Sequence, residues 1–445
     1  MSSDRNDIAR QIVERSLGAE SLSPGGPSHV VDGRPIAVVA RPRNVDGVSV
    51  LLTEANAQGT IVMPVGGGTR LSLGNMGQTP GIALDTTALN QPVSINSADL
   101  TATFEAGMTL QAVQEILAES GQFLAMDSAR SDQATIGGIL ASGASGPLKW
   151  QYGNPRDLVI GMKVVQADGT ITKSGGQVVK NVSGYDMARL HVGGMGTLGI
   201  ICEVSFKLTP KPANEKTALV AFSDLKSCCD AAISIFNSQV APLALTVFDS
   251  AVLSASSIPD IAGDHFLAVR LGGRSRALTR MTDETIKTSQ SAGATNVEIL
   301  EGDSALDLWK HLSDFGWEGD ALPNVVVRAS LLPNQVKAYV DAIGASSTGV
   351  APSCVASPGY GNVMVFWRSH SGADDLESSR AAIQTAQAEA VKLGGSAIIE
   401  RCPVELKSEL DVWGEAGDSI EIMRRLKQQY DPKGILSPGR FIGGI

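Results

Sequence analysis

The chain has 445 residues, which is too long for one ordinary hydrophobic core and predicts two or three domains. A formal net charge of −10 and an aromatic content of only 4% argue against a DNA- or RNA-binding protein. The five cysteines have no paired spacing, which argues against a disulfide framework and indicates a reducing compartment.

The first 34 residues predict a short N-terminal extension. Residues 4–17 form an amphipathic helical pattern, and residues 21–34, rich in glycine and proline, predict a linker. The N-terminus has no apolar signal core, and no uncharged run reaches the roughly 18 residues of a spanning helix. We therefore expect a cytoplasmic protein that meets the inner face of a membrane only through partner proteins.

From residue 35 onwards, strand and helix patterns alternate. Residues 36–40 and 61–65 predict strands, and residues 44–58 between them predict a helix. The later elements follow from apolar periodicity, a threonine cap and an Asp-Gly turn: a strand at 103–106, a helix at 109–121, a hairpin at 159–173 and a strand at 200–208. Two prolines then mark a boundary, so residues 35–212 are predicted to form one domain.

Residues 213–445 have a different pattern of predicted strands and helices, with no visible internal repeat. The predicted strands and helices of this region are strands at 217–222, 266–271, 325–331 and 363–367, and helices at 225–237, 276–291, 376–393 and 420–429. Strands and helices in this mixture indicate an α+β domain with an antiparallel sheet.

Glycine-rich loops carry the strongest signals for function. The segment Gly66-Gly67-Gly68-Thr69 follows a predicted strand, and consecutive glycines let several backbone N–H groups converge on an anion such as a pyrophosphate. The segment is neither a G-x-G-x-x-G fingerprint nor a P-loop, because the required residues do not follow. An ordinary turn is the alternative interpretation.

Two further loops have similar character. Residues 132–146 are small enough to let a flat ring system lie on the backbone, although close packing of a strand against a helix explains them equally well. Residues 193–200 lead into a strand, and a glycine-rich turn is the alternative there.

The three loops in this order, with Tyr152-Gly153, Arg156-Asp157 and Asp168-Gly169 between them, resemble the FAD domain of the vanillyl-alcohol-oxidase (PCMH-type) family. More narrowly, the segments 180–186 and 190–193 resemble the FAD-binding E subunit of bacterial glycolate oxidase. The tail resembles that subunit too, in Leu426-Lys427, Asp431-Pro432, Gly434 and Pro438-Gly439-Arg440. The resemblance implies a PCMH-type FAD-binding domain of two subdomains, and a ferredoxin-like cap that forms the substrate pocket.

The resemblance also implies which residues bind FAD. Residues 66–69 would hold the pyrophosphate, the second loop would line the flavin, and the third would meet the adenosine side. The complete set is Pro64, Val65, Gly66, Gly67, Gly68, Thr69, Asp127, Thr135, Ile136, Gly137, Gly138, Ser142, Gly196 and Ile200. Some members of the family tether FAD through His or Cys, but this chain has neither beside the first two loops, so we expect non-covalent FAD.

One feature of catalytic relatives is missing from the sequence. Relatives that oxidise 2-hydroxy acids carry a His-x-Gly-Asp-Gly-Asn-x-His segment whose histidines hold a metal ion. The nearest stretch here, residues 356–363, keeps Gly361-Asn362 and has no histidine. His370 lies beyond it alone, and a lone His is more often structural. We therefore predict no metal site.

Arg328 is the candidate for binding a substrate carboxylate. It interrupts an apolar strand pattern, and its fork of donors suits a carboxylate. An ordinary salt bridge is the alternative explanation.

Three functions remain open at this stage. The leading one is the FAD subunit of a glycolate oxidase-like complex, which oxidises glycolate or D-lactate and passes electrons to a second FAD subunit and an iron–sulfur subunit. The alternatives are a self-sufficient FAD-dependent 2-hydroxy-acid dehydrogenase and a structural subunit that only keeps the fold. The sequence does not distinguish substrates that differ by one methyl group.

Overall fold

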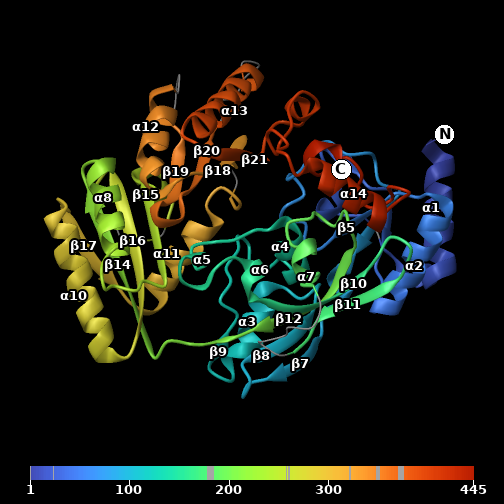
Figure 1. The fold of residues 1–445 in the computed structure, drawn as a ribbon, viewed down its shortest axis with the longest axis horizontal. Coiled ribbons are helices and arrows are strands. Elements are labelled where there is room, and N and C mark those ends of the chain that lie inside the picture. Colours follow the sequence, from blue (N-terminus) through green and yellow to red (C-terminus); the bar gives the residue numbers. More distant parts are fainter. Residues whose placement is uncertain are drawn as a thin grey trace. The chain divides into compact units, whose positions relative to one another are not determined.

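The computed structural model describes residues 2–23, 25–177, 185–256, 258, 261–319, 322–346, 351–368 and 375–445 (Figure 1). Residues 180–184 of the E-subunit resemblance and His370 lie outside the described residues. The chain divides into two compact units. Unit 1 comprises Met1–Ser145, Asn154–Lys211 and Lys407–Ile445, and unit 2 comprises Gly146–Gly153 and Pro212–Leu406.

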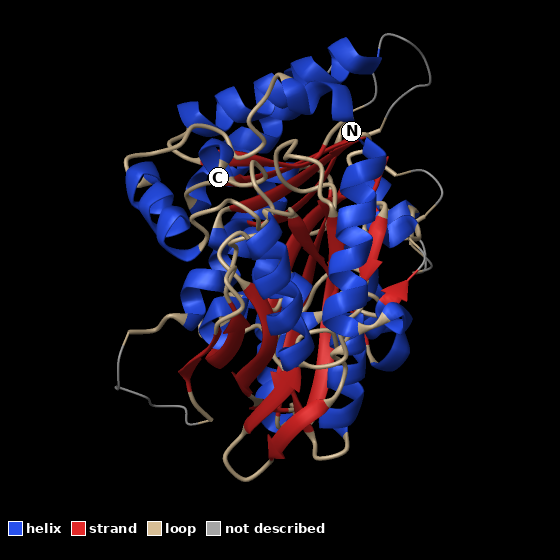
Figure 2. Cartoon of the chain, turned by 90° about the vertical axis from the view of Figure 1, so that its right-hand side faces the viewer, coloured by secondary structure: helices blue, strands red, loops and turns tan. Residues whose placement is uncertain are grey.

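Both units contain helices and strands, and helices lie alongside the strands (Figure 2). The α-helices are α1 (Ser2–Leu17), α2 (Val45–Gln58), α3 (Leu110–Ala118), α4 (Ile136–Ser142), α5 (Lys149–Tyr152), α6 (Pro155–Leu158), α7 (Ala188–His191), α8 (Leu225–Phe236), α9 (Ser250–Ser254), α10 (Ser275–Ser291), α11 (Gly302–Asp314), α12 (Val336–Ser346), α13 (Asp375–Lys392) and α14 (Ile420–Tyr430). The strands of unit 1 are β1 (Leu22–Ser23), β2 (Val30–Val31), β3 (Arg34–Pro35), β4 (Val38–Ala40), β5 (Val62–Val65), β6 (Ile82–Asp85), β7 (Pro92–Asn96), β8 (Thr101–Glu105), β9 (Gln122–Phe123), β10 (Val159–Val165), β11 (Ile171–Gly175), β12 (Ile200–Lys207) and β13 (Thr209–Pro210). The strands of unit 2 are β14 (Asn214–Phe222), β15 (Ala244–Asp249), β16 (His265–Gly273), β17 (Asn296–Leu300), β18 (Val325–Ser330), β19 (Ser353–Ser357), β20 (Asn362–Trp367) and β21 (Ser396–Arg401).

Unit 1 is built on two main sheets. The first has the order β1-β4-β6-β5, in which β4, β6 and β5 are parallel. Helix α2 begins because the Asn44 side chain accepts a hydrogen bond from the Gly47 amide, and it ends where Gly59 adopts φ 64°, a left-handed conformation that favours glycine. The second sheet is antiparallel, with the order β11-β10-β12-β8-β7, and its core includes residues of α3 and α4.

Unit 2 contains one eight-stranded antiparallel sheet with a hidden duplication. The strand order is β17-β14-β16-β15-β19-β20-β18-β21, so two βαββαβ units of ferredoxin-like topology meet edge to edge. The edges join where β15 pairs with β19, with Val247 opposite Ala356 and Phe248 opposite Val355. The predicted α+β class with a ferredoxin-like antiparallel cap is therefore confirmed. The two halves of the sheet repeat the same strand order, although no repeat was visible in the sequence.

The division of the chain differs from the predicted one in two places. Residues 407–445 were expected in the cap, yet they belong to unit 1, where Lys407 pairs with Asp32 at 2.6 Å. Residues 146–153 were expected in the FAD-binding domain, yet they belong to unit 2, where the Trp150 ring packs edge-on against Phe236 with centroids 5.2 Å apart. In both places the segment is joined to its unit by a contact with a residue distant in sequence, an ion pair in one and a ring contact in the other. Such contacts leave no local sequence pattern. No helix in the described part of the chain is long and apolar enough to cross a bilayer.

Candidate FAD site

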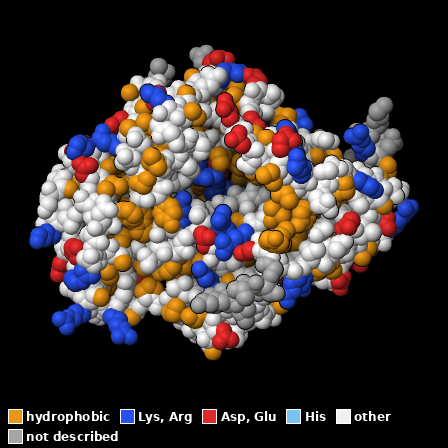
Figure 3. Space-filling view, in the orientation of Figure 1, with side chains coloured by type: hydrophobic (Ala, Val, Ile, Leu, Met, Phe, Trp, Pro, Cys, Tyr) orange, Lys and Arg blue, Asp and Glu red, His pale blue; other side chains and the backbone are white. Residues whose placement is uncertain are grey.

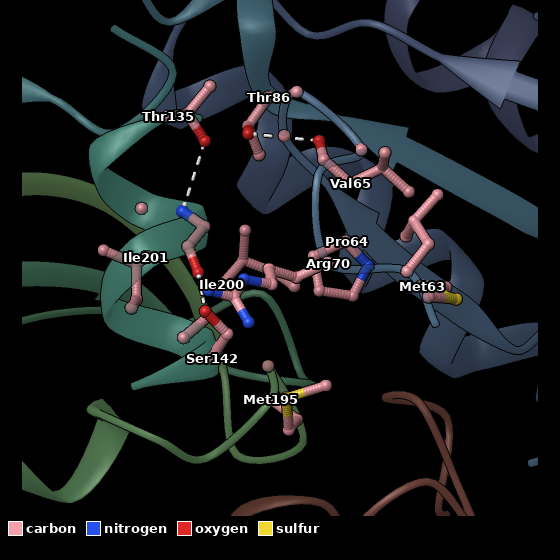
Figure 4. A pocket seen from close by; sticks show the side chains of 18 of the residues that line it. Met63, Pro64, Val65, Arg70, Thr86, Thr135, Ser142, Met195, Ile200 and Ile201 are labelled. Atoms are coloured by element: carbon pink, nitrogen blue, oxygen red, sulfur yellow. Dashed lines mark hydrogen bonds between the residues drawn. The ribbon is translucent and has the colours of Figure 1, made fainter. Parts of the chain in front are cut away.

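One cavity of unit 1 collects almost all of the residues predicted to bind FAD (Figure 4). It is lined at the end of β5, along the loop after that strand, on α4 and on the loop before β12. The predicted residues that line it are Pro64, Val65, Gly66, Gly67, Gly68, Thr69, Thr135, Gly137, Gly138, Ser142, Gly196 and Ile200.

Two predicted residues are not among those lining the cavity. Ile136 is fully buried in the apolar core, and its amide donates to the Met108 carbonyl at 2.9 Å. It therefore belongs to the core around α4, and the cofactor role assigned to it stays a prediction. Asp127 is absent from the lining as well.

The first loop presents backbone amides without partners. Among the hydrogen bonds of the described residues, none uses the amides of residues 66–69 as donors. The end of β5 is held because the Thr86 hydroxyl donates to the Val65 carbonyl at 3.2 Å. Consecutive unpaired N–H groups in a glycine loop suit an anion with several oxygens, such as a pyrophosphate.

The glycines of this loop also serve a packing purpose that the sequence did not reveal. A Cβ atom at Gly67 would lie 1.8 Å from the Gln133 carbonyl oxygen, and one at Gly66 would lie 2.2 Å from Thr135 Oγ1. Two of the glycines are therefore needed for the first loop to rest on the second, whether or not a ligand approaches them.

The second loop leads into α4, whose first turn faces the cavity. Thr135 Oγ1 accepts from the Gly138 amide at 3.2 Å, and the Ser142 hydroxyl donates to the Gly138 carbonyl at 2.8 Å (Figure 4). A Cβ atom at Gly137 would lie 2.8 Å from Ala106 Cβ, which makes this glycine a packing requirement. A Cβ atom at Gly138 would meet only Thr135 Oγ1, at 3.1 Å, so this position opens towards the cavity.

The third loop lies against α4 and against the strand that precedes the first loop. The Met195 amide donates to the Ala141 carbonyl at 2.8 Å, which fixes the loop to α4. Gly196 has φ 70°, and a Cβ atom there would lie 2.4 Å from Pro64 Cγ. The three glycine-rich segments thus form one surface, as their shared role required.

Three cations from the C-terminal segment hold these loops in place: Lys407 and Arg440 are buried, and Lys427 is partly buried. None of the three was predicted to have this role. Lys407 Nζ donates to the Ser72 carbonyl at 2.6 Å, and Lys427 Nζ donates to the Thr197 carbonyl at 2.9 Å. Arg440 Nη2 donates to the Leu71 carbonyl at 2.9 Å and to the Leu73 carbonyl. In the sequence, Lys427 and Arg440 stood out only because the tail resembles that of the E subunit. Their physical role is to donate hydrogen bonds to loop carbonyls.

Each of these cations has a carboxylate partner within unit 1. Asp32 accepts from Lys407 and from Arg440, and Asp431 accepts from Lys427 at 2.7 Å. Burial lowers the pKa of Lys427 against the opposing effect of Asp431. Paired and hydrogen-bonded in this way, the cations are tolerated in the interior.

The cavity therefore fits FAD by its own chemistry: it has free loop amides, cationic side chains and a surface of small residues. The family model for the FAD binding domain matches residues 36–175, and the model for the C-terminal domain of FAD linked oxidases matches residues 211–441, just over half of the chain. The chain belongs to the FAD-linked oxidases. It is an FAD-dependent oxidoreductase, and FAD, when bound, supplies the two-electron acceptor.

Curated relatives of this FAD-linked oxidase match over nearly its full length. The glycolate oxidase subunit GlcD of Bacillus subtilis is 27% identical over 98% of this chain and 96% of its own. The D-2-hydroxyglutarate dehydrogenase of Xanthomonas citri is 27% identical over 92% and 89%, and the D-lactate dehydrogenase of Archaeoglobus fulgidus is 26% identical over 91% of both chains.

Solved structures agree on the fold. A p-cresol methylhydroxylase with substrate bound has a TM-score of 0.74 and 16% identity, over 98% of this chain and 96% of its own. An alkyldihydroxyacetonephosphate synthase has a TM-score of 0.71 and 18% identity, over 97% and 84%. At this identity the likeness concerns the fold alone, and the PCMH-type prediction is confirmed.

In the cap of this FAD-linked oxidase, Arg328 takes part in an ion pair. It lies on β18, where Nε donates to Glu400 Oε1 of β21 at 2.6 Å. The Glu400 side chain is 5% exposed, whereas that of Arg328 is 29% exposed. Arg328 therefore forms the salt bridge that was the alternative explanation, and its binding of a substrate carboxylate stays a prediction.

Other reactive groups offer no second centre among the described residues. No group of three or more His, Cys, Asp or Glu side chains there is placed to hold a metal ion, and His370 lies outside that part of the chain. All five cysteines are free and buried, and burial raises the pKa of Cys202 and Cys229 to about 12. Both remain thiols at neutral pH, which is the inert form.

Proposed function

We propose that this chain is the FAD-binding subunit of a glycolate oxidase-like complex that oxidises glycolate or D-lactate to the 2-oxo acid. Electrons pass from its flavin to a second FAD subunit and an iron–sulfur subunit. The observation that carries the proposal is the cavity of three joined loops with free amides at residues 66–69. The names of the curated relatives, which include a glycolate oxidase subunit and a D-lactate dehydrogenase, support the substrate class.

We expect catalysis to depend on partner subunits because the sequence contains few residues that could bind a small 2-hydroxy acid. Oxidation of a 2-hydroxy acid needs a held carboxylate, a polarised hydroxyl and a base within reach. The sequence has no His-x-Gly-Asp-Gly-Asn-x-His segment, and Arg328 is the visible substitute in the cap. Its Nε is engaged by Glu400, which fixes the guanidinium, so only the outer nitrogens are left for a substrate carboxylate.

The test is anaerobic mixing of the isolated chain with glycolate or D-lactate while flavin absorbance is followed. We expect slow or absent bleaching with the chain alone, and faster bleaching after the two partner subunits are added. The yellow colour should leave the protein on acid precipitation, because the FAD is expected to be non-covalent.

A self-sufficient 2-hydroxy-acid dehydrogenase is the second candidate. The observation in its favour is the partly exposed Arg328, oriented by a buried carboxylate. Rapid bleaching by the lone chain that disappears in Arg328→Ala would replace the first proposal with this one. The same loss without a change in FAD content would assign Arg328 to the substrate.

A further inference from the structure

Arg70 gives the FAD cavity a charge that the backbone loops do not supply. It follows Thr69 directly, and its side chain lies in the cavity between Pro64, Ile200 and Ser142 (Figure 4). The charged residues among those lining the cavity are Arg70 and Arg440, and none of the lining residues is acidic. By contrast, basic and acidic side chains are interspersed on the outer face shown in Figure 3, and the chain as a whole carries −10.

The two arginines differ in what their charge faces. Arg440 is 3% exposed, pairs with Asp32 at 3.1 Å and donates to loop carbonyls, so its charge is used within the protein. Arg70 is only partly buried, and its side chain is one of those that line the cavity. Because no lining residue is acidic, Arg70 is a cationic side chain that the cavity can present to an anion.

A pyrophosphate needs more than amides. Four backbone N–H groups orient phosphate oxygens, but they carry no net charge against the two negative charges of FAD. A guanidinium presents a planar fork of donors that matches phosphate oxygens, and such charge-assisted bonds are about twice as strong as neutral ones. Residues 66–69 and Arg70 are consecutive and all line the cavity, so one loop supplies both kinds of donor.

We propose that Arg70 is the counter-charge for the pyrophosphate of bound FAD and acts together with the amides of residues 66–69. The inference rests on the proposed assignment of this cavity to FAD. It predicts selectivity: FAD should lose affinity when Arg70 is replaced, whereas riboflavin, which has the same ring system and no phosphate, should not.

The experiment titrates apoprotein with FAD and with riboflavin, following the quenching of flavin fluorescence. The variants are Arg70→Ala and Arg70→Lys, with Arg43→Ala as control, because Arg43 is exposed, lies in unit 1 and changes the net charge equally. Arg70→Ala should raise the Kd for FAD about tenfold or more, as loss of a charge-assisted contact implies. Arg70→Lys should recover part of the affinity, and Arg43→Ala should resemble wild type.

The salt dependence of FAD binding gives a second measure. The wild-type Kd should rise with ionic strength more steeply than that of Arg70→Ala, because one ionic contact is missing in the variant. The comparison of salt dependences also tests the role of Arg70 if neither wild type nor the variant binds riboflavin. An equal loss of FAD and riboflavin affinity, or an unchanged Kd with an unchanged salt slope, would overturn the role of Arg70. Failure of wild-type apoprotein to bind FAD at all would instead overturn the assignment of the cavity.

Discussion

The FAD cavity and the cap sheet encode their functions in different ways. In the cavity, the important property is the absence of side chains: Cβ atoms at Gly66, Gly67 and Gly196 would collide with neighbouring segments of the chain. In the cap, the important property is a pairing of charges across strands, Arg328 with Glu400, whose sequence numbers differ by 72. Backbone geometry restricts residue type locally and so leaves a readable pattern, whereas a distant ion pair leaves none.

The strongest way to break the cavity is Gly67→Val. The added Cβ would lie 1.8 Å from the backbone of Gln133, and backbone cannot give way as a flexible side chain can. We expect complete loss of FAD together with a loss of about 3 kcal/mol or more in the free energy of unfolding, in the range of severe overpacking. Flavin absorbance and urea unfolding of the purified variant measure the two effects. Stoichiometric FAD in this variant would show that the loops do not pack as described.

Removal of a supporting cation should act nearly as strongly. Lys427→Met leaves the Asp431 carboxylate, which is fully buried, without its cation and frees the Thr197 carbonyl of the third loop. Breaking a buried pair costs about 3–5 kcal/mol. The FAD Kd should rise as well, because the third loop loses its anchor. Lys433→Met, an exposed lysine of the same segment, is the control and should leave both quantities close to wild type.

A pH dependence of stability should follow from His191. This residue lies beside the third loop, and burial lowers its pKa to about 4 from the usual 6.5. Above pH 6.5 both the folded and the unfolded state hold it neutral; between 6.5 and 4 only the unfolded state takes up the proton. The unfolding free energy should therefore fall by up to about 3 kcal/mol as the pH drops through this window.

The comparison of wild type with His191→Phe isolates this contribution. Unfolding free energies at pH 7 and pH 4.5 should differ less in the variant than in wild type. An identical pH dependence in both proteins would mean that His191 is protonated without cost in the folded state.

The smallest effect concerns the cap pair. Because the Arg328 side chain is 29% exposed, solvent screens it, and the double-mutant cycle of Arg328→Met with Glu400→Gln should give a coupling energy of about 1 kcal/mol. FAD content should not change in any of the three variants. A coupling energy near zero would show that Glu400 does not orient Arg328, and would weaken the case for a preset carboxylate site.

Much of the fold was predictable because the patterns involved are local. The strand before Gly66, the cap of α2 at Asn44 and the glycine after that helix are signals within a few residues. The association of the tail with unit 1 was not predictable, because it depends on Asp32 meeting Lys407 and Arg440 across almost the whole chain. The duplicated topology of the cap was not visible for a related reason. Many different apolar residues can fill equivalent buried positions, so two halves of the same fold need not have similar sequences.

The prediction of the site had the same limits. The glycines were found because few other residues fit such backbone, but their packing role emerged only from the contacts of Gly67 and Gly137 with neighbouring backbone. Ile136 lies between two cavity residues in the sequence, yet its side chain is buried in the core, and sequence position alone does not reveal that direction. Arg70 follows Thr69 directly, yet only the folded loop shows that its side chain turns into the cavity.

The most direct test of the account is FAD binding by Gly138→Leu. Gly138 is the glycine of α4 whose Cβ would meet only Thr135 Oγ1, at 3.1 Å, so a larger side chain should occupy the cavity with only a small shift of that hydroxyl. Gly417→Leu is the matched control, because a Cβ there meets nothing within 4 Å and the residue is exposed. We expect that apoprotein of both variants unfolds at the wild-type urea concentration, that Gly417→Leu binds FAD normally, and that Gly138→Leu does not bind it. Stoichiometric, wild-type-like FAD binding by Gly138→Leu would contradict the assignment of this cavity to the cofactor.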